Sequence, residues 1–274
     1  MGFHLVSWKI EENACFCPPP SLWTVACFGS IRKMNKTKKV GIVGGIGPAS
    51  TLDYYSGIIH GVRQRTKGDG YPEILINSID MTEMLSFLKN REWEGLIQRL
   101  LRAIQNLADA GAEFAAIASN TPHVVFDEVQ SLSALPLVSI VEATCKYAQA
   151  KGCKRAVILG TRFTMSSGMY SAAFAQHGMV AVAPPEAVQT AIDGLIFPKL
   201  EEGILVPEDK LRMVEMAGGL LEEHHADSLL LGCTELPLML KDGDLDTLML
   251  NTTQIHIEAI VHYSTMATLE QPRR

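Results

Sequence analysis

Val40-Gly-Ile-Val43 followed by Gly44-Gly-Ile-Gly-Pro-Ala-Ser-Thr51 decides the fold class. A short run that is apolar throughout is typical of a strand buried on both faces, and the glycines that follow are typical of a tight strand-to-helix turn. Similar runs predict strands at 40–43, 74–77, 114–117, 137–141, 156–159, 228–231 and 247–250. Helical patterns at 93–110 and 207–225 lie between them, so we predict an α/β fold with mainly parallel sheets.

Small polar segments follow these strands twice in the same order. Gly44–Thr51 corresponds to Gly160-Thr-Arg-Phe-Thr-Met-Ser-Ser167, Ser119-Asn-Thr121 to Cys233-Thr-Glu235, and Ser139 to Asn251-Thr-Thr253. The separation stays near 112 to 116 residues, which is too long for the repeat of a solenoid and indicates a duplicated domain. We therefore expect two pseudosymmetric doubly wound domains, each with a mainly parallel sheet flanked by helices.

The division predicted from this repeat has three parts. Residues 1–37 form an N-terminal extension, 38–138 plus 248–268 form the first domain, and 139–247 form the second. Ligands of parallel α/β sheets bind beyond the carboxyl ends of the strands. The active site is expected between the two domains, with Ser119 and Cys233 at equivalent places on its two sides.

Composition excludes several classes of function. The 274 residues are 47% hydrophobic and 20% charged, with a net charge of −6, so a sizeable core is possible and a nucleic-acid surface is not expected. No apolar stretch reaches the roughly 18 residues of a membrane span. Six cysteines without a disulfide pattern favour a reducing cytoplasm. A homodimer is compatible with the exposed helix faces of such folds.

Two motifs resemble binding sites but fit poorly. Cys15-Phe-Cys17 is too closely spaced for half of a zinc site and has no matching Cys or His pair, so no metal is expected. The turn at Gly45-Ile-Gly47 has Ser50 where a dinucleotide fingerprint requires a third glycine. We therefore expect a structural turn, with Ser50 and Thr51 as helix caps.

Cys233 is the strongest candidate for chemistry. It lies between Gly232 and Thr234 at the end of an apolar strand, where the N-terminus of a following helix favours a thiolate that acts as a base or nucleophile. By contrast, Cys145 and Cys153 are expected to be buried and inert. Met81 and Met84 are interpreted as core residues.

Four motifs in order resemble the aspartate/glutamate racemase family over about residues 38–268. They are Gly44–Thr51, Ala118-Ser-Asn-Thr-Pro-His123, Gly160-Thr-Arg-Phe-Thr-Met165 and Gly232-Cys-Thr-Glu-Leu-Pro237. The resemblance implies two pseudosymmetric α/β domains and an active site that uses no pyridoxal phosphate or metal. One residue from each domain would act on opposite faces of the α-carbon of an amino acid.

The resemblance also implies roles for individual residues. Cys233 matches the second catalytic cysteine, and Ser119 stands where the first is usual. Positions that hold the substrate's carboxylate and amino groups are matched by Gly45, Asn120, Thr121, Thr161 and Thr234, and Glu235 matches an acidic residue after the second cysteine.

This sequence departs from the family pattern at two places. A serine hydroxyl forms its anion far less readily than a thiol, so Ser119 is not expected to act as a resting base. In some racemases an Arg and a Lys bind the substrate's distal carboxylate, but neither residue is present at 78–82 or 186–190 of this sequence. Arg162 either supplies a positive charge in their place or is a surface residue. Racemisation is the leading interpretation. A one-cysteine decarboxylase or isomerase and an inactive ligand-binding relative stay open.

Overall fold

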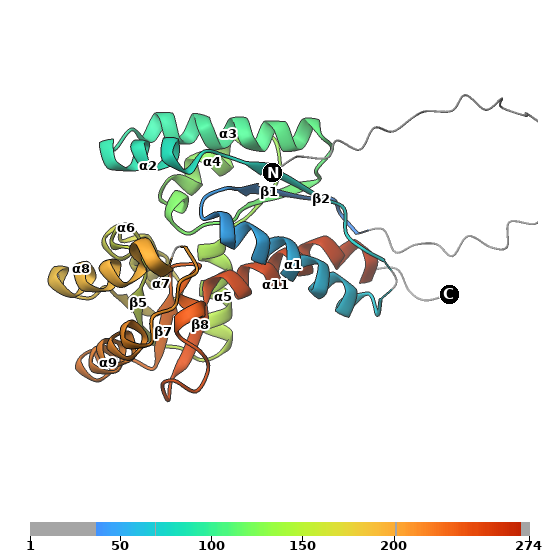
Figure 1. The fold of residues 1–274 in the computed structure, drawn as a ribbon. Helices are drawn as coiled ribbons and strands as arrows, with labels where there is room; N and C mark the ends of the chain where they lie inside the picture. Colours follow the sequence, from blue (N-terminus) through green and yellow to red (C-terminus); the bar gives the residue numbers. More distant parts are fainter. Residues whose placement is uncertain (1–36, 69, 201, 270–274) are drawn as a thin grey trace, which may run out of the picture. The chain divides into compact units, whose positions relative to one another are not determined.

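The computed structural model describes residues 37–68, 70–200 and 202–269. Expectations for the N-terminal extension and for Cys15 and Cys17 therefore lie outside the described residues. Within the described residues, two parallel four-stranded sheets have the same strand order, β2-β1-β3-β4 and β6-β5-β7-β8 (Figure 1). This identical order is the structural counterpart of the sequence repeat, and it confirms the predicted α/β class with two pseudosymmetric halves.

The first sheet contains β1 (Val40–Gly44), β2 (Ile74–Ser78), β3 (Phe114–Ile117) and β4 (Leu137–Val138). The second contains β5 (Arg155–Leu159), β6 (Val180–Val182), β7 (Ser228–Leu231) and β8 (Leu248–Asn251). The central strands β1, β3 and β7 are buried along their whole length, as their unbroken apolar sequences require.

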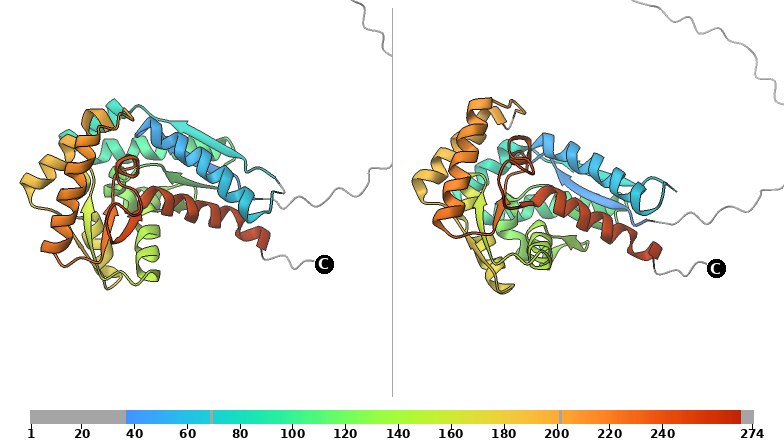
Figure 2. Two further views of the ribbon diagram at one scale, coloured as in Figure 1. Left: turned by 60° about the horizontal axis from the view of Figure 1, so that its bottom comes forward. Right: turned by 90° about the horizontal axis from the view of Figure 1, so that it is seen from below.

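Helices cover both faces of each sheet (Figures 1 and 2). In the first half these are α1 (Pro48–Arg65), α2 (Met81–Asn90), α3 (Trp93–Asp109) and α4 (Phe126–Leu132). The others, in chain order, are α5 (Ile140–Ala150), α6 (Arg162–Ser166), α7 (Met169–Gln176), α8 (Glu186–Leu195), α9 (Pro207–Glu223), α10 (Leu236–Met239) and α11 (Thr252–Leu269). No helix in the described part of the chain is apolar over a length that could cross a membrane.

The final helix after each sheet packs into the core of the other half. α5 follows β4 but contributes Ile140 and Cys145 to the second core, and α11 follows β8 but contributes Ile257 and Val261 to the first. α1 and α11 lie side by side (Figure 2) because Gly57 and Gly61 allow close approach: a Cβ at Gly57 would meet Ile257 at 2.9 Å, and one at Gly61 would meet Val261 at 2.7 Å. This exchange of helices joins the halves.

Two expectations need correction. The segment 248–251 was assigned to the first domain, but β8 pairs with β7 in the second sheet, because it is the counterpart of β4. The strand predicted at 137–141 is only two residues long, because the Ser139 side chain accepts a hydrogen bond from the Glu142 backbone N–H and starts α5 at Ile140. The short edge strand β6 was missed from the sequence.

Candidate active site

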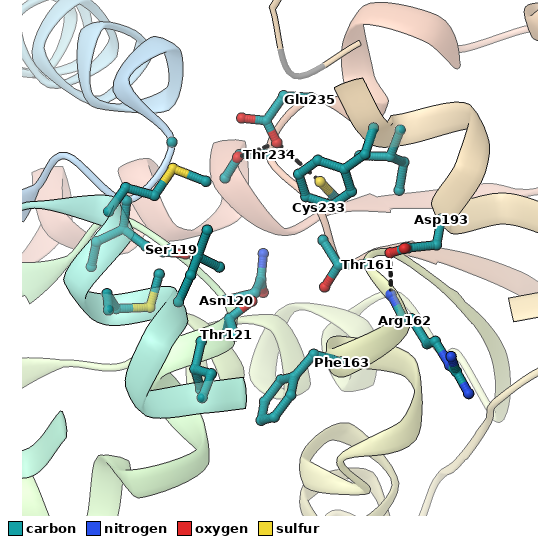
Figure 3. Close-up of a pocket in the computed structure, with 18 of the residues that line it drawn as sticks. Ser119, Asn120, Thr121, Thr161, Arg162, Phe163, Asp193, Cys233, Thr234 and Glu235 are labelled. Carbon is teal, nitrogen blue, oxygen red and sulfur yellow. Dashed lines mark hydrogen bonds between the residues drawn. The ribbon is translucent and has the colours of Figure 1, made fainter. Parts of the chain in front are cut away.

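A cavity of about 320 Å³ lies at the carboxyl ends of β1, β3, β5 and β7, between the two sheets (Figure 3). Both halves contribute to its wall, as expected for a site between the domains. The structure brings seven of the eight residues predicted for the site to this cavity: Ser119, Asn120, Thr121, Thr161, Cys233, Thr234 and Glu235.

Cys233 lies two residues beyond the end of β7 and is almost completely buried. Its Sγ donates a hydrogen bond to Glu235 Oε2 over 2.9 Å, and the Thr234 hydroxyl donates to the same oxygen over 2.7 Å. The helix expected after Cys233 is present as α10, although it is only four residues long. The thiol is therefore held in place by a carboxylate two residues further along the chain.

The other two cysteines in the described residues are different. Burial, the main cause, and the charge of Glu142 raise the pKa of Cys145 to about 12. Burial raises the pKa of Cys153 to about 11, although a hydrogen bond with Ser228 opposes the shift. Both thiols stay protonated near neutral pH, in agreement with the expectation that they are inert.

Ser119 occupies the place after β3 that Cys233 occupies after β7, and Figure 3 shows the two reaching the cavity from opposite sides. Within the described residues, the Ser119 hydroxyl makes no hydrogen bond, whereas its backbone carbonyl oxygen lies 2.9 Å from His123 Nδ1. The position of Ser119 thus depends on backbone contacts, and its hydroxyl is available to a ligand.

His123 supports the Ser119 loop as a neutral imidazole. The Ile140 backbone N–H donates to His123 Nε2 over 3.3 Å, so the ring proton lies on Nδ1 and is donated to the Ser119 carbonyl. The ring also stacks on Phe126 with centroids 4.9 Å apart. Burial is the main cause that lowers the pKa of His123 to about 3, and the electrostatic interaction with His256 lowers it further.

Asn120 binds other protein groups with both ends of its side chain. Its Oδ1 accepts a hydrogen bond from the Tyr170 hydroxyl, and its Nδ2 donates to Thr252 Oγ1 over 3.1 Å. Tyr170 and Thr252 belong to α7 and α11, so Asn120 connects the β3 loop to elements that follow the second sheet's strands. One amide hydrogen remains for a ligand.

Thr121 of the first half and Thr164 of the second also join the two halves. The Thr161 side chain caps α6 by accepting from the Thr164 backbone N–H, and the Thr164 hydroxyl lies 3.5 Å from that of Thr121. The backbone N–H groups of Asn120, Thr121 and Thr234 donate to no group in the described residues. Several donors of both halves therefore remain for an anionic group in the cavity.

Gly45 does not line the cavity, contrary to expectation. Its φ is +83°, and a Cβ there would lie 2.3 Å from the Ile79 carbonyl oxygen, so the position requires glycine. Its N–H donates a hydrogen bond to Thr51 Oγ1, so Gly45 is part of the turn between β1 and α1. Gly47 takes its place at the cavity, where a Cβ would lie 3.1 Å from Glu235 Oε1.

The apolar part of the cavity was missed from the sequence. Met81 and Met84, interpreted as core residues, line it together with Leu85 and Leu88 of α2. From the second half come Phe163, Ile196 and Phe197. The spacing of the α2 residues at one helix face was the available signal, but the same spacing is usual for residues of a core.

Besides Glu235, the charged residues that line the cavity are Lys89, Arg162 and Asp193. Arg162 pairs with the exposed Glu186, and its guanidinium points away from Cys233 and Ser119 (Figure 3). The sequence left open whether Arg162 replaces the missing cations, and in the structure it acts as a surface residue. Asp193 was not predicted, because nothing in the sequence distinguishes it from other helical acidic residues.

No group of three or more His, Cys, Asp and Glu side chains is arranged to hold a metal ion in the described ranges. The buried pair His123 and His256 is instead satisfied by protein groups. His256 donates from Nε2 to the Val138 carbonyl and accepts at Nδ1 from the Tyr54 hydroxyl.

Comparison with known proteins identifies the family. A family model described as Asp/Glu/Hydantoin racemase matches residues 43–260. A broad specificity amino-acid racemase from Bacillus subtilis (strain 168) is 27% identical over 208 residues, covering 73% of this chain and 87% of the relative. A glutamate racemase from Syntrophus aciditrophicus (strain SB) is 33% identical over 126 residues, covering 45% of this chain and 44% of the relative.

A solved structure shares both sequence and fold. The crystal structure of an aspartate racemase homologue from Pyrococcus horikoshii OT3 superposes with a TM-score of 0.73 at 35% identity, covering 83% of this chain and 99% of that chain. The chain therefore belongs to the Asp/Glu/Hydantoin racemase family.

Proposed function

We propose that this protein is an amino-acid racemase in which Cys233 and Ser119 exchange protons with opposite faces of the substrate's α-carbon. The observation that carries the proposal is that these two side chains occupy equivalent positions after β7 and β3 and line one cavity. Family membership supports the class of reaction, because the named relatives are racemases acting on amino acids.

The substrate's carboxylate would lie against the backbone N–H groups of Asn120, Thr121 and Thr234. These groups have no partner in the described residues, and they come from both halves. Donors fixed in advance around a carboxylate stabilise the negative charge that develops when the α-proton leaves. Binding at this place would present the two faces of the α-carbon to Cys233 and Ser119.

Glu235 would serve Cys233 by accepting its thiol proton. The 2.9 Å hydrogen bond from Sγ to Glu235 Oε2 already defines the route. A thiolate formed in this way takes the α-proton from one face, and the opposite face receives a proton from the Ser119 side. Because a serine hydroxyl is a weak acid, we expect Ser119 to relay this proton from water rather than to act as a base at rest.

The experiment that tests the function is racemisation of a panel of L- and D-amino acids followed by chiral chromatography. The wild-type protein should convert at least one enantiomer into the other, and Cys233→Ala should abolish conversion. Cys153→Ala is the matched control, since Cys153 is also buried but lies outside the cavity. Full conversion by Cys233→Ala would overturn the proposal.

One observation favours a second candidate. Cys233 is the only thiol that lines the cavity among the described residues, which also suits a one-cysteine decarboxylase or isomerase on this scaffold. That candidate predicts release of carbon dioxide from a carboxylated substrate and full activity in Ser119→Ala. Racemisation predicts no carbon dioxide and a strong loss in Ser119→Ala, so the two measurements separate the candidates.

A further inference from the structure

Asp193 places a carboxylate in the cavity wall (Figure 3). It lies in the last turn of α8, is half-buried, and accepts a hydrogen bond at Oδ1 from the Arg162 backbone N–H over 2.7 Å. In residues 37–269 as described, no basic side chain forms an ion pair with Asp193, and its Oδ2 accepts no hydrogen bond. A partly buried carboxylate without a cation attracts a positively charged ligand group.

The basic residue next to it does not neutralise this charge. The Arg162 guanidinium pairs with Glu186, and both side chains are mostly exposed, at 53% and 79%. Figure 3 shows the Arg162 side chain leaving the cavity while the Asp193 carboxylate stays in its wall. The Asp193 carboxylate is thus held by the Arg162 backbone N–H and is open to a ligand.

The other residues in this part of the wall are apolar. The lining includes Phe163, Ile196 and Phe197 of the second half and Met81 and Leu85 of the first. Such a surface suits the methylene groups of an extended side chain, because burying them from water is favourable. It offers little to a short carboxylate side chain.

We propose that the cavity selects amino acids whose aliphatic side chain ends in a cation, an ammonium or a guanidinium, with Asp193 as the specificity-determining residue. The inference rests on the proposed racemase function. The substrate's methylene groups would contact the apolar wall, and its terminal cation would donate to Asp193 Oδ2. Oδ1 would keep its hydrogen bond with Arg162, so the carboxylate needs no rearrangement to bind.

Lys89 is the competing determinant. It also lines the cavity, and an ammonium there would favour a distal carboxylate instead. Its side chain is exposed to solvent and forms no ion pair with the described residues, whereas Asp193 is fixed by a backbone hydrogen bond. Because the Asp193 carboxylate is held in place before the substrate binds, it favours a substrate with a cationic side chain. Lys89 would favour an anionic side chain, so the two residues predict opposite substrate preferences.

The test compares kcat/KM for L-lysine, L-norleucine and L-glutamate, with loss of the α-hydrogen signal in D₂O as the readout. L-norleucine has a straight side chain with the same number of carbon atoms as lysine but ends in a methyl group and has no ammonium. The wild type should prefer lysine to both others, and Asp193→Asn should lower the lysine-to-norleucine ratio by about 10- to 100-fold. The asparagine keeps an oxygen for the Arg162 N–H, so the variant removes the charge and retains this hydrogen bond.

Glu186→Gln is the matched control, because Glu186 contacts Arg162 but does not line the cavity, and its lysine-to-norleucine ratio should stay at the wild-type value. A wild-type preference for glutamate that Lys89→Gln abolishes would overturn the inference while leaving the racemase function intact. Exchange of no amino acid by a folded protein would instead overturn the proposed function itself. The wild-type preference alone decides the question if Asp193→Asn does not fold.

Discussion

The Tyr170 hydroxyl donates a hydrogen bond of 2.5 Å to Asn120 Oδ1, joining α7 in the second half to the loop that carries Ser119 in the first. Both residues are buried. Asn120 in turn donates a hydrogen bond to the Thr252 hydroxyl, and that hydroxyl donates to the Leu231 carbonyl at the end of β7. The loops after β3 and β7 are thus linked by hydrogen bonds through the centre of the molecule.

Removing this hydroxyl should destabilise the protein. Tyr170→Phe leaves Asn120 Oδ1 buried without its donor, which we expect to lower the free energy of unfolding by about 1 to 3 kcal/mol. Urea denaturation followed by circular dichroism measures the change. Tyr147→Phe in α5 is the control, because no hydrogen bond of the Tyr147 hydroxyl is present in the described residues. Equal midpoints for the two variants would show that the Tyr170 bond contributes nothing.

Gly45→Ala should destabilise the turn before α1. The residue has a φ of +83°, and its new Cβ would meet the Ile79 carbonyl oxygen at 2.3 Å, so we expect a loss of more than about 2 kcal/mol in the free energy of unfolding. Gly219→Ala in α9 provides the contrast, since nothing lies within 4 Å of its Cβ. There alanine should stabilise the helix by about 0.5 to 1 kcal/mol. A neutral Gly45→Ala would contradict the turn geometry.

The buried histidines predict a loss of stability in acid. Burial lowers the pKa of His123 to about 3 and that of His256 to about 4, from a usual value of 6.5. The contribution of the two neutral histidines to the free energy of unfolding is complete above about pH 6.5 and is lost as the pH falls. The reason is that both rings become protonated in the unfolded chain at a higher pH than in the folded chain.

Between about pH 6.5 and pH 4, the two histidines together should reduce the free energy of unfolding by up to about 2.7 kcal/mol per pH unit. Urea titrations at several pH values give the slope. NMR spectra of the imidazole rings give an independent check, since both rings should stay neutral at pH 5.5 in the folded protein. Protonation of either ring near pH 6.5 would contradict the assignment.

Glu235→Gln should impair catalysis more than substrate binding. The amide oxygen can still accept hydrogen bonds from Cys233 and Thr234, but it is a far weaker acceptor for the thiol proton, so we expect kcat to fall by about 100-fold. KM should change much less. Steady-state kinetics with the best substrate of the panel separates the two constants. An unchanged kcat would exclude Glu235 from the proton route.

Much of the architecture could be predicted from the sequence because the duplicated loops repeat at nearly constant spacing. Strands buried on both faces are apolar throughout, which made β1, β3 and β7 recognisable. β6 was missed because it is a short edge strand with an exposed first residue, Val180. The predicted division placed 139–247 in the second domain and 248–268 in the first, so it already included the exchange of α5 and α11 between the cores, but it moved β8 together with α11.

The polar side of the candidate site was easier to predict than its apolar side. Small polar residues at strand ends, such as Ser119 and Thr234, stand out from their apolar surroundings. Met84 and Leu88 cannot be distinguished from core residues by sequence, because a helix presents the same spacing to a core and to a cavity. Gly45 was expected at the cavity and does not line it, because in sequence a glycine needed for backbone conformation looks the same as one that approaches a ligand.

Whether Cys233 moves the α-proton is decided by solvent deuterium incorporation at the substrate's α-carbon, followed by ¹H NMR for the wild type and Cys233→Ala side by side. We expect the α-hydrogen signal of the preferred amino acid to disappear in D₂O with the wild type and to persist with the variant. Undiminished exchange in a folded Cys233→Ala protein would contradict the claim that Cys233 moves the α-proton.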